Sequence, residues 1–328
     1  MPKKRILSGM RPTGKMHLGN YLGALENWIA LQDEYQNYHL IADYHVLTTN
    51  LSTDEIYSNT IEMVTDWLAA GLDPQKSPIF RQSQIKEHTE LFLIFSMLIT
   101  KARLERNPTL KEQVRDLNIE NLIYGHLGYP VLQAADILLY KGEVVPVGED
   151  QLPHIEITRE LARKFNSQYC QDAPIFPEPE AKMTNFARLP GLDGQRMSKS
   201  VGNTILLSDS PDIVIQKLKK AVTDPQKMRK NDPGRPEVCL VFTYHKKFNP
   251  SEVPEIDTNC RSGVLGCVDC KMKCASKINE MLAPILEKRK SYENNVNKVV
   301  DIINDGEAKA KEIAESTMIE VHQKMKIG

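Results

Sequence analysis

The chain is 328 residues long, with 41% hydrophobic and 26% charged residues, which indicates a soluble globular protein with room for a large domain and a smaller one. No apolar run approaches the roughly 20 residues of a membrane-spanning helix, and the first residues lack the apolar stretch of a signal peptide, so we expect a cytoplasmic protein with no membrane contact. The net charge of −1 excludes an evenly basic nucleic-acid binder, although residues 186–290 carry 19 Lys/Arg against 12 Asp/Glu, a local excess of +7 that favours a polyanionic partner docked in one place.

Strand-like and helix-like segments alternate through the first 170 or so residues. Apolar runs of strand length lie at 5–10, 38–47, 77–83 and 144–150. Helical patterns lie at 16–31, 52–71, 87–106, 130–142 and 154–165, and the second of these opens with a capping box at Ser52 and stops at Gly71. Strands separated by helices of this length predict an α/β fold with a parallel sheet.

A Pro-rich connection at 168–182 precedes a region in which only helices are predicted. Ser210 and Pro211 are typical of an N-cap and a first helical position, and further helical patterns lie at 271–290 and 307–325. The sequence therefore predicts an α/β domain followed by an α-helical one.

The first glycine-rich stretch, SGMRPTGKMHLGN (Ser8–Asn20), lies where the first strand turns into the first helix. Its three glycines let the backbone approach a ligand, and a helix N-terminus offers free N–H groups to phosphate. The same stretch supplies polar donors and cations at His17, Asn20, Arg11 and Lys15. Because its spacing fits neither GxGxxG nor a Walker loop, a simple tight turn between strand and helix is the alternative.

A second polar stretch, GQRMSKSVGN (Gly194–Asn203), holds Arg196 and Lys199 among loop residues. Two cations and two serines in such a loop favour a phosphate clamp, which suits a reaction in which charge develops on a leaving phosphate group. A solvated surface loop is the alternative.

Taken together, HLGN and RMSKS, about 180 residues apart, resemble the two signature motifs of class I aminoacyl-tRNA synthetases. Asn20 stands where the family has His, and Arg196 stands where it has Lys. Within that class the chain resembles the tryptophanyl-tRNA synthetases over essentially its full length. The stretches that carry this likeness are PVGEDQ (Pro146–Gln151), YPVLQAADILLY (Tyr129–Tyr140) and ERNPTLKEQ (Glu105–Gln113).

The resemblance implies a homodimeric tryptophan–tRNA ligase that uses ATP and Mg²⁺ to activate L-tryptophan and transfers it to tRNA(Trp). It also implies a Rossmann-type catalytic domain over 1–185, an α-helical anticodon-binding domain over 186–290 that starts with the second motif, and C-terminal helices over 291–328 that pack back on the catalytic domain. A tyrosyl-tRNA synthetase, a non-catalytic RNA-binding paralogue and a nucleotidylyltransferase remain as alternatives.

The family's functional residues fall on matching positions here. The implied catalytic residues are His17, Asn20, Arg196, Lys199 and Lys111. The implied ATP-binding residues are Arg11, Gly19, Asn20, Gly148, Asp150, Met197, Ser198 and Lys199. The implied tryptophan-binding residues are Gly9, His45, Tyr129, Gln133, Asp136 and Gln151. Leu7 and Gln133 stand where some family members have Phe and Met.

Asp136 also has a physical rationale, because the indole nitrogen is only a donor and a pocket that selects it needs a buried acceptor. A carboxylate in an apolar helix is costly unless donors reach it; a buried Asp that caps a neighbouring helix is the alternative. For Lys111 the alternative is a solvated lysine on a helix surface.

Four of the six cysteines predict a metal site, with spacers of twenty, six and two residues between Cys239, Cys260, Cys267 and Cys270. Spacing alone leaves zinc and an iron–sulfur cluster open. A subset of the tryptophanyl-tRNA synthetases that the chain resembles has a four-cysteine [4Fe–4S] site in this region, which favours iron. Cys274 is a possible substitute ligand, and Cys170 stands alone. The expected role is a cross-link that fixes a loop between two helices and presents a basic surface to the tRNA anticodon end; stabilisation of the helical domain alone is the alternative.

Overall fold

A five-stranded parallel sheet forms the centre of the computed structural model, which describes residues 3–116, 119–170, 172–183 and 189–327. The strands are β1 (Arg5–Met10), β2 (Gln36–Ile41), β3 (Ile79–Arg81), β4 (Val144–Val147) and β5 (Glu180–Met183), in the order β3-β2-β1-β4-β5. All four pairings are parallel, so the predicted α/β fold is confirmed. The direction of the strand order changes at β1 and β4, and ligands of such sheets bind where it changes, outside the carboxyl ends of the strands.

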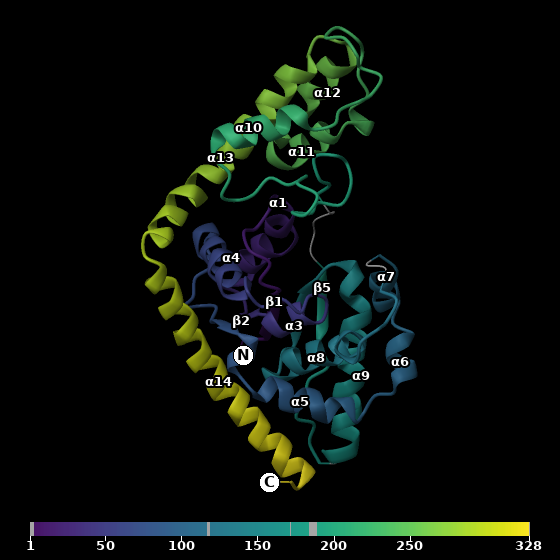
Figure 1. The fold of residues 1–328 in the computed structure, drawn as a ribbon, viewed down its shortest axis with the longest axis vertical. Helices are drawn as coiled ribbons and strands as arrows, with labels where there is room; N and C mark the ends of the chain where they lie inside the picture. Colours follow the sequence, from purple (N-terminus) through teal and green to yellow (C-terminus); the bar gives the residue numbers. More distant parts are fainter. Residues whose placement is uncertain (1–2, 117–118, 171, 184–188, 328) are drawn as a thin grey trace.

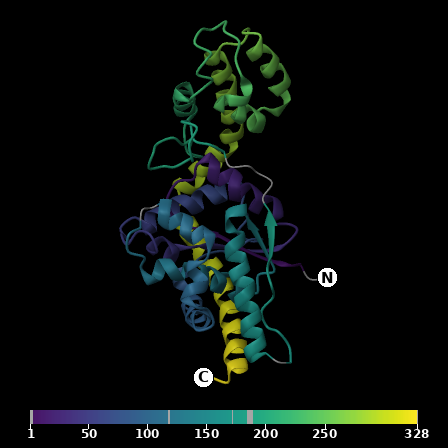
Figure 2. The same cartoon turned by 90° about the vertical axis from the view of Figure 1, so that its right-hand side faces the viewer.

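The helices that surround the sheet come from both halves of the chain (Figures 1 and 2). In the first half they are α1 (Leu18–Asn20), a π-helical turn (Tyr21–Leu25), α2 (Glu26–Leu31), α3 (Asp43–Leu47), α4 (Ile56–Ala70), α5 (Glu87–Ser96), α6 (Lys101–Glu105), α7 (Pro108–Asp116), α8 (Tyr124–Leu139) and α9 (Leu152–Tyr169). Short 3₁₀ turns lie at Gln82–Gln84 and Glu149–Gln151. Among the described residues, no helix is long and apolar enough to cross a membrane.

Beyond residue 189 the described structure is helical, as predicted. Its helices are α10 (Pro211–Lys220), α11 (Leu240–Phe248), α12 (Val253–Arg261), α13 (Cys267–Glu293) and α14 (Val296–Met325), with 3₁₀ turns at Pro236–Val238 and Pro250–Glu252. Ser210 caps α10 through its side chain and Pro211 opens that helix, as the sequence indicates. In Figure 1, α10–α13 form the upper part of the molecule, and α14 runs down past the sheet to the C-terminus. The predicted boundary between residues 185 and 186 lies outside the described residues.

Two apolar cores lie on opposite faces of the sheet, because neighbouring residues of a strand point to opposite faces. Leu40 and Phe80 belong to the core that also holds side chains of α5, α8 and α9, while Ile41 and Ile79 belong to the other. That second core takes in side chains of α2, α4, α10 and α13. The sheet and the helical part are therefore joined by one continuous core.

Several predicted element boundaries are wrong. The strand predicted at 38–47 ends at Ile41, and the residues from Asp43 to Leu47 form α3 instead. Asp43 begins this helix, and its carboxylate accepts from the backbone N–H of Ser83 (3.0 Å). The helix expected from Ser52 begins at Ile56, and the N–H of Ser52 donates to Asn50 Oδ1 (3.0 Å) instead of entering a capping box. The predicted helix at 87–106 is broken, since Thr100 caps a new helix by accepting from the N–H of Arg103 (3.3 Å).

Helix α14 crosses the edge of the sheet at Gly306, which touches the backbone of β3. A Cβ atom at Gly306 would lie 2.0 Å from the carbonyl oxygen of Ile79. We therefore expect Gly306→Ala to lower the midpoint of urea or thermal unfolding by the equivalent of about 2–3 kcal/mol, although Ala is otherwise better than Gly in a helix by about 1 kcal/mol. Gly125→Ala in α8 is the matched control, because nothing lies within 4 Å of its added Cβ; a Gly306→Ala variant as stable as that control would contradict this packing.

Candidate active site

The two polar loops that the sequence singles out pair with each other through their backbones. The N–H of Leu18 donates to the carbonyl of Ile205 (2.9 Å), the N–H of Leu207 donates to the carbonyl of Met16 (2.9 Å), and His17 forms an antiparallel bridge with Leu206. This pairing joins the first loop to the segment that directly follows Gly194–Asn203. Two stretches about 180 residues apart thus form one site at the carboxyl end of β1.

The side chains of the two loops also meet. Lys199 Nζ donates to the carbonyl oxygens of Thr13 and Lys15, the latter at 3.0 Å. A Cβ atom at Gly19 would lie 3.0 Å from His17 Nδ1 and 3.2 Å from Met197 Sδ, so a side chain there would crowd both of these groups. His17 and Asn20 cap α1 reciprocally, because each side chain accepts from the other residue's backbone N–H (3.2 and 3.3 Å).

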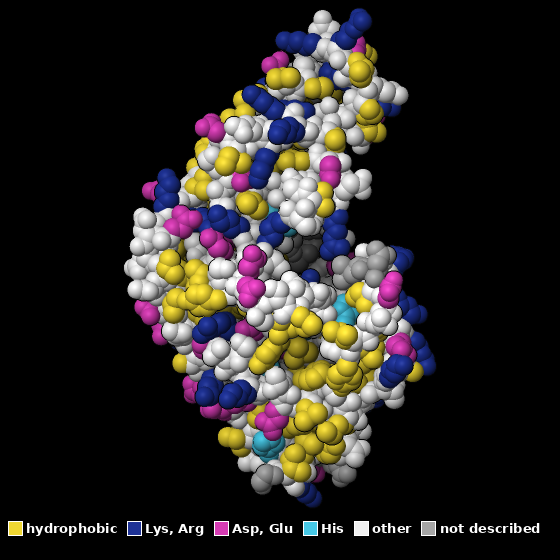
Figure 3. All heavy atoms as spheres, viewed as in Figure 1, with side chains coloured by type: hydrophobic (Ala, Val, Ile, Leu, Met, Phe, Trp, Pro, Cys, Tyr) yellow, Lys and Arg dark blue, Asp and Glu magenta, His cyan; other side chains and the backbone are white. Residues whose placement is uncertain are grey.

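Burial sets the charges at this junction. Burial and, to a smaller extent, the nearby Lys199 cation lower the pKa of His17 to about 4, so His17 is a neutral hydrogen-bonding group at neutral pH. Burial also lowers the pKa of Lys199, while the charge of Asp66 opposes this effect. Arg196 is exposed, and Figure 3 shows Lys and Arg side chains at the rim of the hollow between the helical part and the sheet. A neutral donor beside cations suits a polyphosphate.

A cavity of about 390 Å³ lies beside this junction, at the carboxyl ends of β1, β2 and β4. All of the residues predicted to bind the amino acid line it, namely Gly9, His45, Tyr129, Gln133, Asp136 and Gln151. Arg11 and Gly148 of the predicted ATP site line it as well. A Cβ atom at Gly9 would lie 2.7 Å from the carbonyl oxygen of Leu40, so β1 can approach β2 this closely only because residue 9 has no side chain.

Asp136 stands at the far end of the cavity and is nearly fully buried (2% exposed). Its Oδ1 accepts from Gln82 Nε2 (2.7 Å) and pairs with His88 Nδ1 (2.7 Å), while its Oδ2 pairs with His45 Nε2 (2.8 Å). Burial raises the pKa of Asp136, but the hydrogen bonds from His45 and His88 outweigh it and lower the pKa to about 2. The carboxylate is therefore ionised at neutral pH. Its partners are side chains around a cavity, so the helix-capping alternative is wrong.

A carboxylate offers about four lone-pair positions, of which these contacts occupy three. The Tyr140 hydroxyl fixes His88 from behind, at 2.9 Å from Nε2. With His88 Nε2 accepting from Tyr140, its Nδ1–H is the donor to Asp136. One acceptor position therefore remains on Oδ2, the oxygen that His45 reaches from the cavity wall. Gln82 and His88 were not predicted from the sequence, because the cost of burying Asp136 requires such donors but does not indicate which residues supply them.

Tyr129 is held by a second buried chain of hydrogen bonds. Its hydroxyl lies 2.8 Å from His154 Nε2, and His154 Nδ1 lies 3.0 Å from Asn107 Nδ2. Burial lowers the pKa of His154 to about 4, which keeps it neutral. This chain fixes the tyrosine ring at the side of the cavity.

Some predicted residues lie outside the cavity wall. Lys111 is exposed on α7, whereas Gln113, two residues further along, lines the cavity. Asp150 is exposed, and its carbonyl accepts from the Thr109 hydroxyl (2.8 Å), which ties α7 to the GEDQ stretch. The remaining predicted catalytic and ATP-binding residues belong to the paired loops described above: His17, Gly19, Asn20, Arg196, Met197, Ser198 and Lys199.

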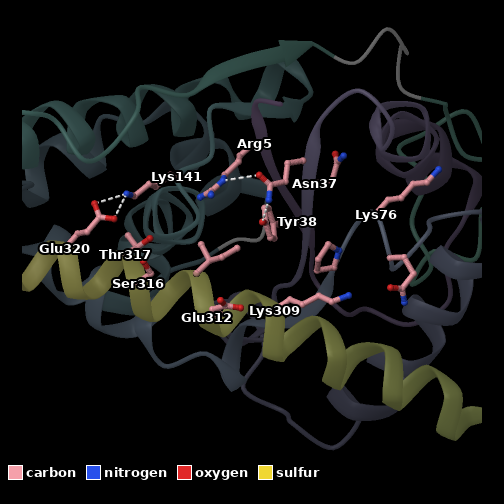
Figure 4. A pocket seen from close by; sticks show the side chains of 14 residues that line it. Arg5, Asn37, Tyr38, Lys76, Lys141, Lys309, Glu312, Ser316, Thr317 and Glu320 are labelled. Carbon is pink, nitrogen blue, oxygen red and sulfur yellow. Dashed lines mark hydrogen bonds and ion pairs between the residues drawn. The ribbon is translucent and has the colours of Figure 1, made fainter. Parts of the chain in front are cut away.

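A larger cavity, of about 650 Å³, lies at the opposite, amino-terminal edge of the sheet (Figure 4). Arg5, Tyr38 and Lys141 line it together with α14, and Lys141 is paired there with Glu320 at 2.7 Å. Because ligands of open parallel sheets bind outside the carboxyl ends of the strands, this cavity is not the catalytic one despite its size.

The predicted metal-binding cysteines gather where α11, α12 and α13 meet. Cys239 precedes α11, Cys260 lies on α12, and Cys267 and Cys270 lie in the first turn of α13. Burial, together with the charges of Cys239, Cys260 and Cys267, raises the pKa of Cys270 to about 12, so the four thiols are electrostatic neighbours. Within the described ranges, however, no group of three or more His, Cys, Asp or Glu side chains is placed to hold a metal ion.

The two remaining cysteines are buried. Cys274 is fully buried in the core with Ala275 and Ile278, and Cys170 is buried in the other core beside Phe165 and Phe176.

Comparison with known proteins agrees with this geometry. The profile of the family described as tRNA synthetases class I (W and Y) matches residues 2–283. Tryptophan–tRNA ligase of Thermotoga maritima is 48% identical, over 98% of this chain and 99% of its own length. The same enzyme of Aquifex aeolicus is 44% identical, over 98% and 100%. The crystal structure of tryptophanyl-tRNA synthetase from Campylobacter jejuni complexed with ADP and tryptophan superposes with a TM-score of 0.87 at 33% identity, covering 98% and 100% of the two chains.

The family profile covers both tryptophan and tyrosine enzymes, whereas the two curated relatives are both tryptophan enzymes. The paired loops, the cavity and these relatives lead to one conclusion. The chain belongs to the tryptophan–tRNA ligases (EC 6.1.1.2) of the class I aminoacyl-tRNA synthetases.

Proposed function

We propose that the cavity binds L-tryptophan and that the paired loops bind ATP for a two-step reaction. The tryptophan carboxylate attacks the α-phosphorus of ATP in line and expels pyrophosphate, which leaves tryptophanyl-adenylate. The adenylate then passes its acyl group to the terminal ribose hydroxyl of tRNA(Trp) and releases AMP. No covalent enzyme intermediate is needed, because catalysis is by positioning and charge stabilisation.

The position left on Asp136 Oδ2 is the observation that carries the assignment of the amino acid. We propose that it accepts the indole N–H, with Tyr129 and Gln151 on the amino group and His45, Gln133 and Gly9 on the walls. Leu7 lines the same cavity. Because the hydrogen-bonded acceptor is fixed before the substrate arrives, an aromatic ring without a donor at this place would leave a buried charge unpaired.

We propose ATP for the loops because cations meet there, with Lys199 between the loops and Arg196 exposed, beside the neutral His17. We propose that Arg11, Gly19, Asn20, Gly148, Asp150, Met197 and Ser198 hold the nucleotide, and that His17, Asn20, Arg196 and Lys199 act on the phosphates. Lys111 would reach them from α7, which Thr109 ties to the GEDQ stretch. Mg²⁺ that accompanies ATP is commonly bound by the phosphates with few protein ligands; it would neutralise charge on the pyrophosphate that leaves.

The experiment that tests this proposal is charging of a tRNA(Trp) transcript by the purified chain. We expect tryptophanyl-tRNA to form together with AMP and pyrophosphate in equal amounts, and only when ATP, tryptophan and the transcript are all present. Formation of ADP, or charging without dependence on tryptophan, would contradict the two-step reaction.

We also propose that the chain acts as a cytoplasmic homodimer. Exposed apolar side chains gather on α5 and at the start of α8, with Leu93, Met97, Leu122, Ile123 and Tyr124 each at least 36% exposed. Contiguous apolar surface of this kind marks contact sites in soluble proteins. We expect the mass in light scattering to be that of two chains, and the double variant Leu93→Glu/Met97→Glu to have the mass of one. A monomeric unaltered chain would contradict the proposal.

For the cysteine site we propose a [4Fe–4S] cluster bound by Cys239, Cys260, Cys267 and Cys270, in a helical domain over 186–290 that contacts the tRNA anticodon end. These four thiolates would hold the cluster, which would supply cross-links between α11, α12 and α13. The mutual effect of the four thiols on the pKa of Cys270 supports this proposal, while the buried position of Cys274 favours a packing role for that residue. Zinc is the alternative.

Removal of the metal tests both the identity and the role of this site. Anaerobically purified protein should be brown with the visible absorption of iron–sulfur charge transfer. Chelation after oxidation should leave tryptophan-dependent pyrophosphate exchange within about twofold of the untreated enzyme, because the site lies outside the paired loops, while tRNA charging falls at least tenfold. Colourless protein with one zinc per chain would contradict the cluster, and loss of exchange before charging would contradict its role.

A further inference from the structure

One arginine is buried at the junction between the helical part and the sheet. Arg289, on α13, is 2% exposed although arginine is almost never fully buried without partners. Its guanidinium donates to Asp66 and Glu62 of α4 and to Glu293 of its own helix (2.8 Å). Asp66 is fully buried, while Glu62 and Glu293 are partly exposed. Asp66 and Arg289 therefore form the buried part of this network, here called the Asp66–Arg289 pair.

The second oxygen of Asp66 reaches the first signature loop. Asp66 Oδ2 accepts from the backbone N–H of Met16 at 2.7 Å. Met16 directly precedes His17, and its carbonyl accepts from the N–H of Leu207. The peptide group before Met16 is thus held by Asp66 of α4. The peptide group after it is held by Leu207, in the segment that follows the second signature loop.

Asp66 also acts on the second loop through its charge. Burial raises the pKa of Asp66 to about 6, an effect that the charge of Arg289 opposes. The charge of Asp66 in turn raises the pKa of Lys199, which burial lowers. One buried carboxylate is therefore hydrogen-bonded to the first loop, electrostatically coupled to the lysine of the second, and ion-paired to α13.

We propose that Asp66 and Arg289 are positioning residues for ATP, which hold the His17 turn against Lys199 and set both relative to α13. This inference rests on the proposed ATP site. Helix α13 is continuous from Cys267 to Glu293, so its far end lies in the cysteine region. The Asp66–Arg289 pair thus lies at the opposite end of α13 from Cys267 and Cys270.

The test is a set of variants assayed by tryptophan-dependent pyrophosphate exchange, with rates per active site from titration of adenylate formation. We expect Asp66→Leu to raise the KM for ATP by about tenfold to a hundredfold, because a displaced turn misplaces the phosphates, and to change the KM for tryptophan by less than about twofold. Asp66→Asn retains an acceptor for Met16 and should fall between Asp66→Leu and the unaltered enzyme. Glu293→Gln, which removes the charge of one of the two partly exposed partners of Arg289, is the matched control and should leave both KM values unchanged.

A double variant separates positioning from stability. Replacing a buried ion pair by apolar side chains of similar volume is often neutral for stability, so Asp66→Leu/Arg289→Met should regain the unfolding midpoint that Asp66→Leu alone loses. If the pair positions ATP, the KM for ATP stays high in the double variant because the Met16 N–H still has no acceptor. A normal KM for ATP in the double variant, or equal rises of both KM values in Asp66→Leu or Asp66→Asn, would overturn the proposal. Should Lys199→Ala also leave exchange unaffected, the ATP site itself would be wrong.

Discussion

Lys199→Ala is expected to lower the rate of tryptophan-dependent pyrophosphate exchange by about a hundredfold to a thousandfold, while the Kd for tryptophan changes less than about threefold. The ammonium group lies between the two loops, bonded to the carbonyl of Lys15, and it has no role at the indole end of the cavity. Removing one group that stabilises charge only in the transition state lowers kcat rather than substrate affinity, with effects of this size.

The matched control is Lys101→Ala, a 75%-exposed lysine of the sheet-bearing part, which should leave the exchange rate within about twofold. The rate can be measured by rapid quench and the tryptophan affinity by intrinsic fluorescence or equilibrium dialysis. Equal losses in rate and in tryptophan affinity would contradict the proposed role of Lys199.

Asp136→Ala is expected to lower kcat/KM for tryptophan by about a hundredfold to a thousandfold, and to abolish discrimination against an analogue in which sulfur replaces the indole N–H. The unaltered carboxylate is ionised and held by Gln82, His88 and His45, so an aromatic ring without a donor leaves its last acceptor position unpaired. Removing the carboxylate removes that penalty for the analogue and the hydrogen bond for tryptophan.

Asp43→Asn is the matched control, because Asp43 is another buried aspartate, accepts from the N–H of Ser83, and lies outside the tryptophan cavity. It should change stability but not the ratio of kcat/KM between tryptophan and the sulfur analogue. If Asp136→Ala lowered kcat/KM equally for both substrates, Asp136 would have only a structural role.

Elements that are buried on both sides were predicted correctly from their sequence pattern. The runs that became β1 and β4 are apolar because both faces of the sheet are covered, and Gly71 ends α4 in the left-handed conformation that glycine favours. The pattern was a poor guide at an edge. Strand β5 pairs with β4 at the edge of the sheet, and its four residues are exposed or half-buried. Its sequence EAKM therefore has no apolar alternation, and the sequence predicts most of it as part of the Pro-rich connection.

The site followed the same division. His17, Lys199 and Asp136 could be proposed from the sequence because each lies in a short stretch whose residue types and order are recognisable without the fold. His88 and Gln82 were missed, because the donors to a buried carboxylate are set by how α5 and the 82–84 turn pack on α8, which no local pattern records. On α7 the expectation fell on Lys111, whereas Gln113 faces the cavity, since residues two apart on a helix point to nearly opposite sides.

The proposed reaction requires two distant loops to bind ATP beside a cavity whose carboxylate accepts an indole N–H. Pyrophosphate exchange by the purified chain with tryptophan, tyrosine and phenylalanine in turn tests it most directly. We expect exchange with tryptophan to exceed that with either other amino acid by at least about a thousandfold in kcat/KM, because phenylalanine has no donor for Asp136 and the single ring of tyrosine carries its O–H at a different place from the indole N–H. Comparable exchange with tyrosine, or none with tryptophan, would contradict the account.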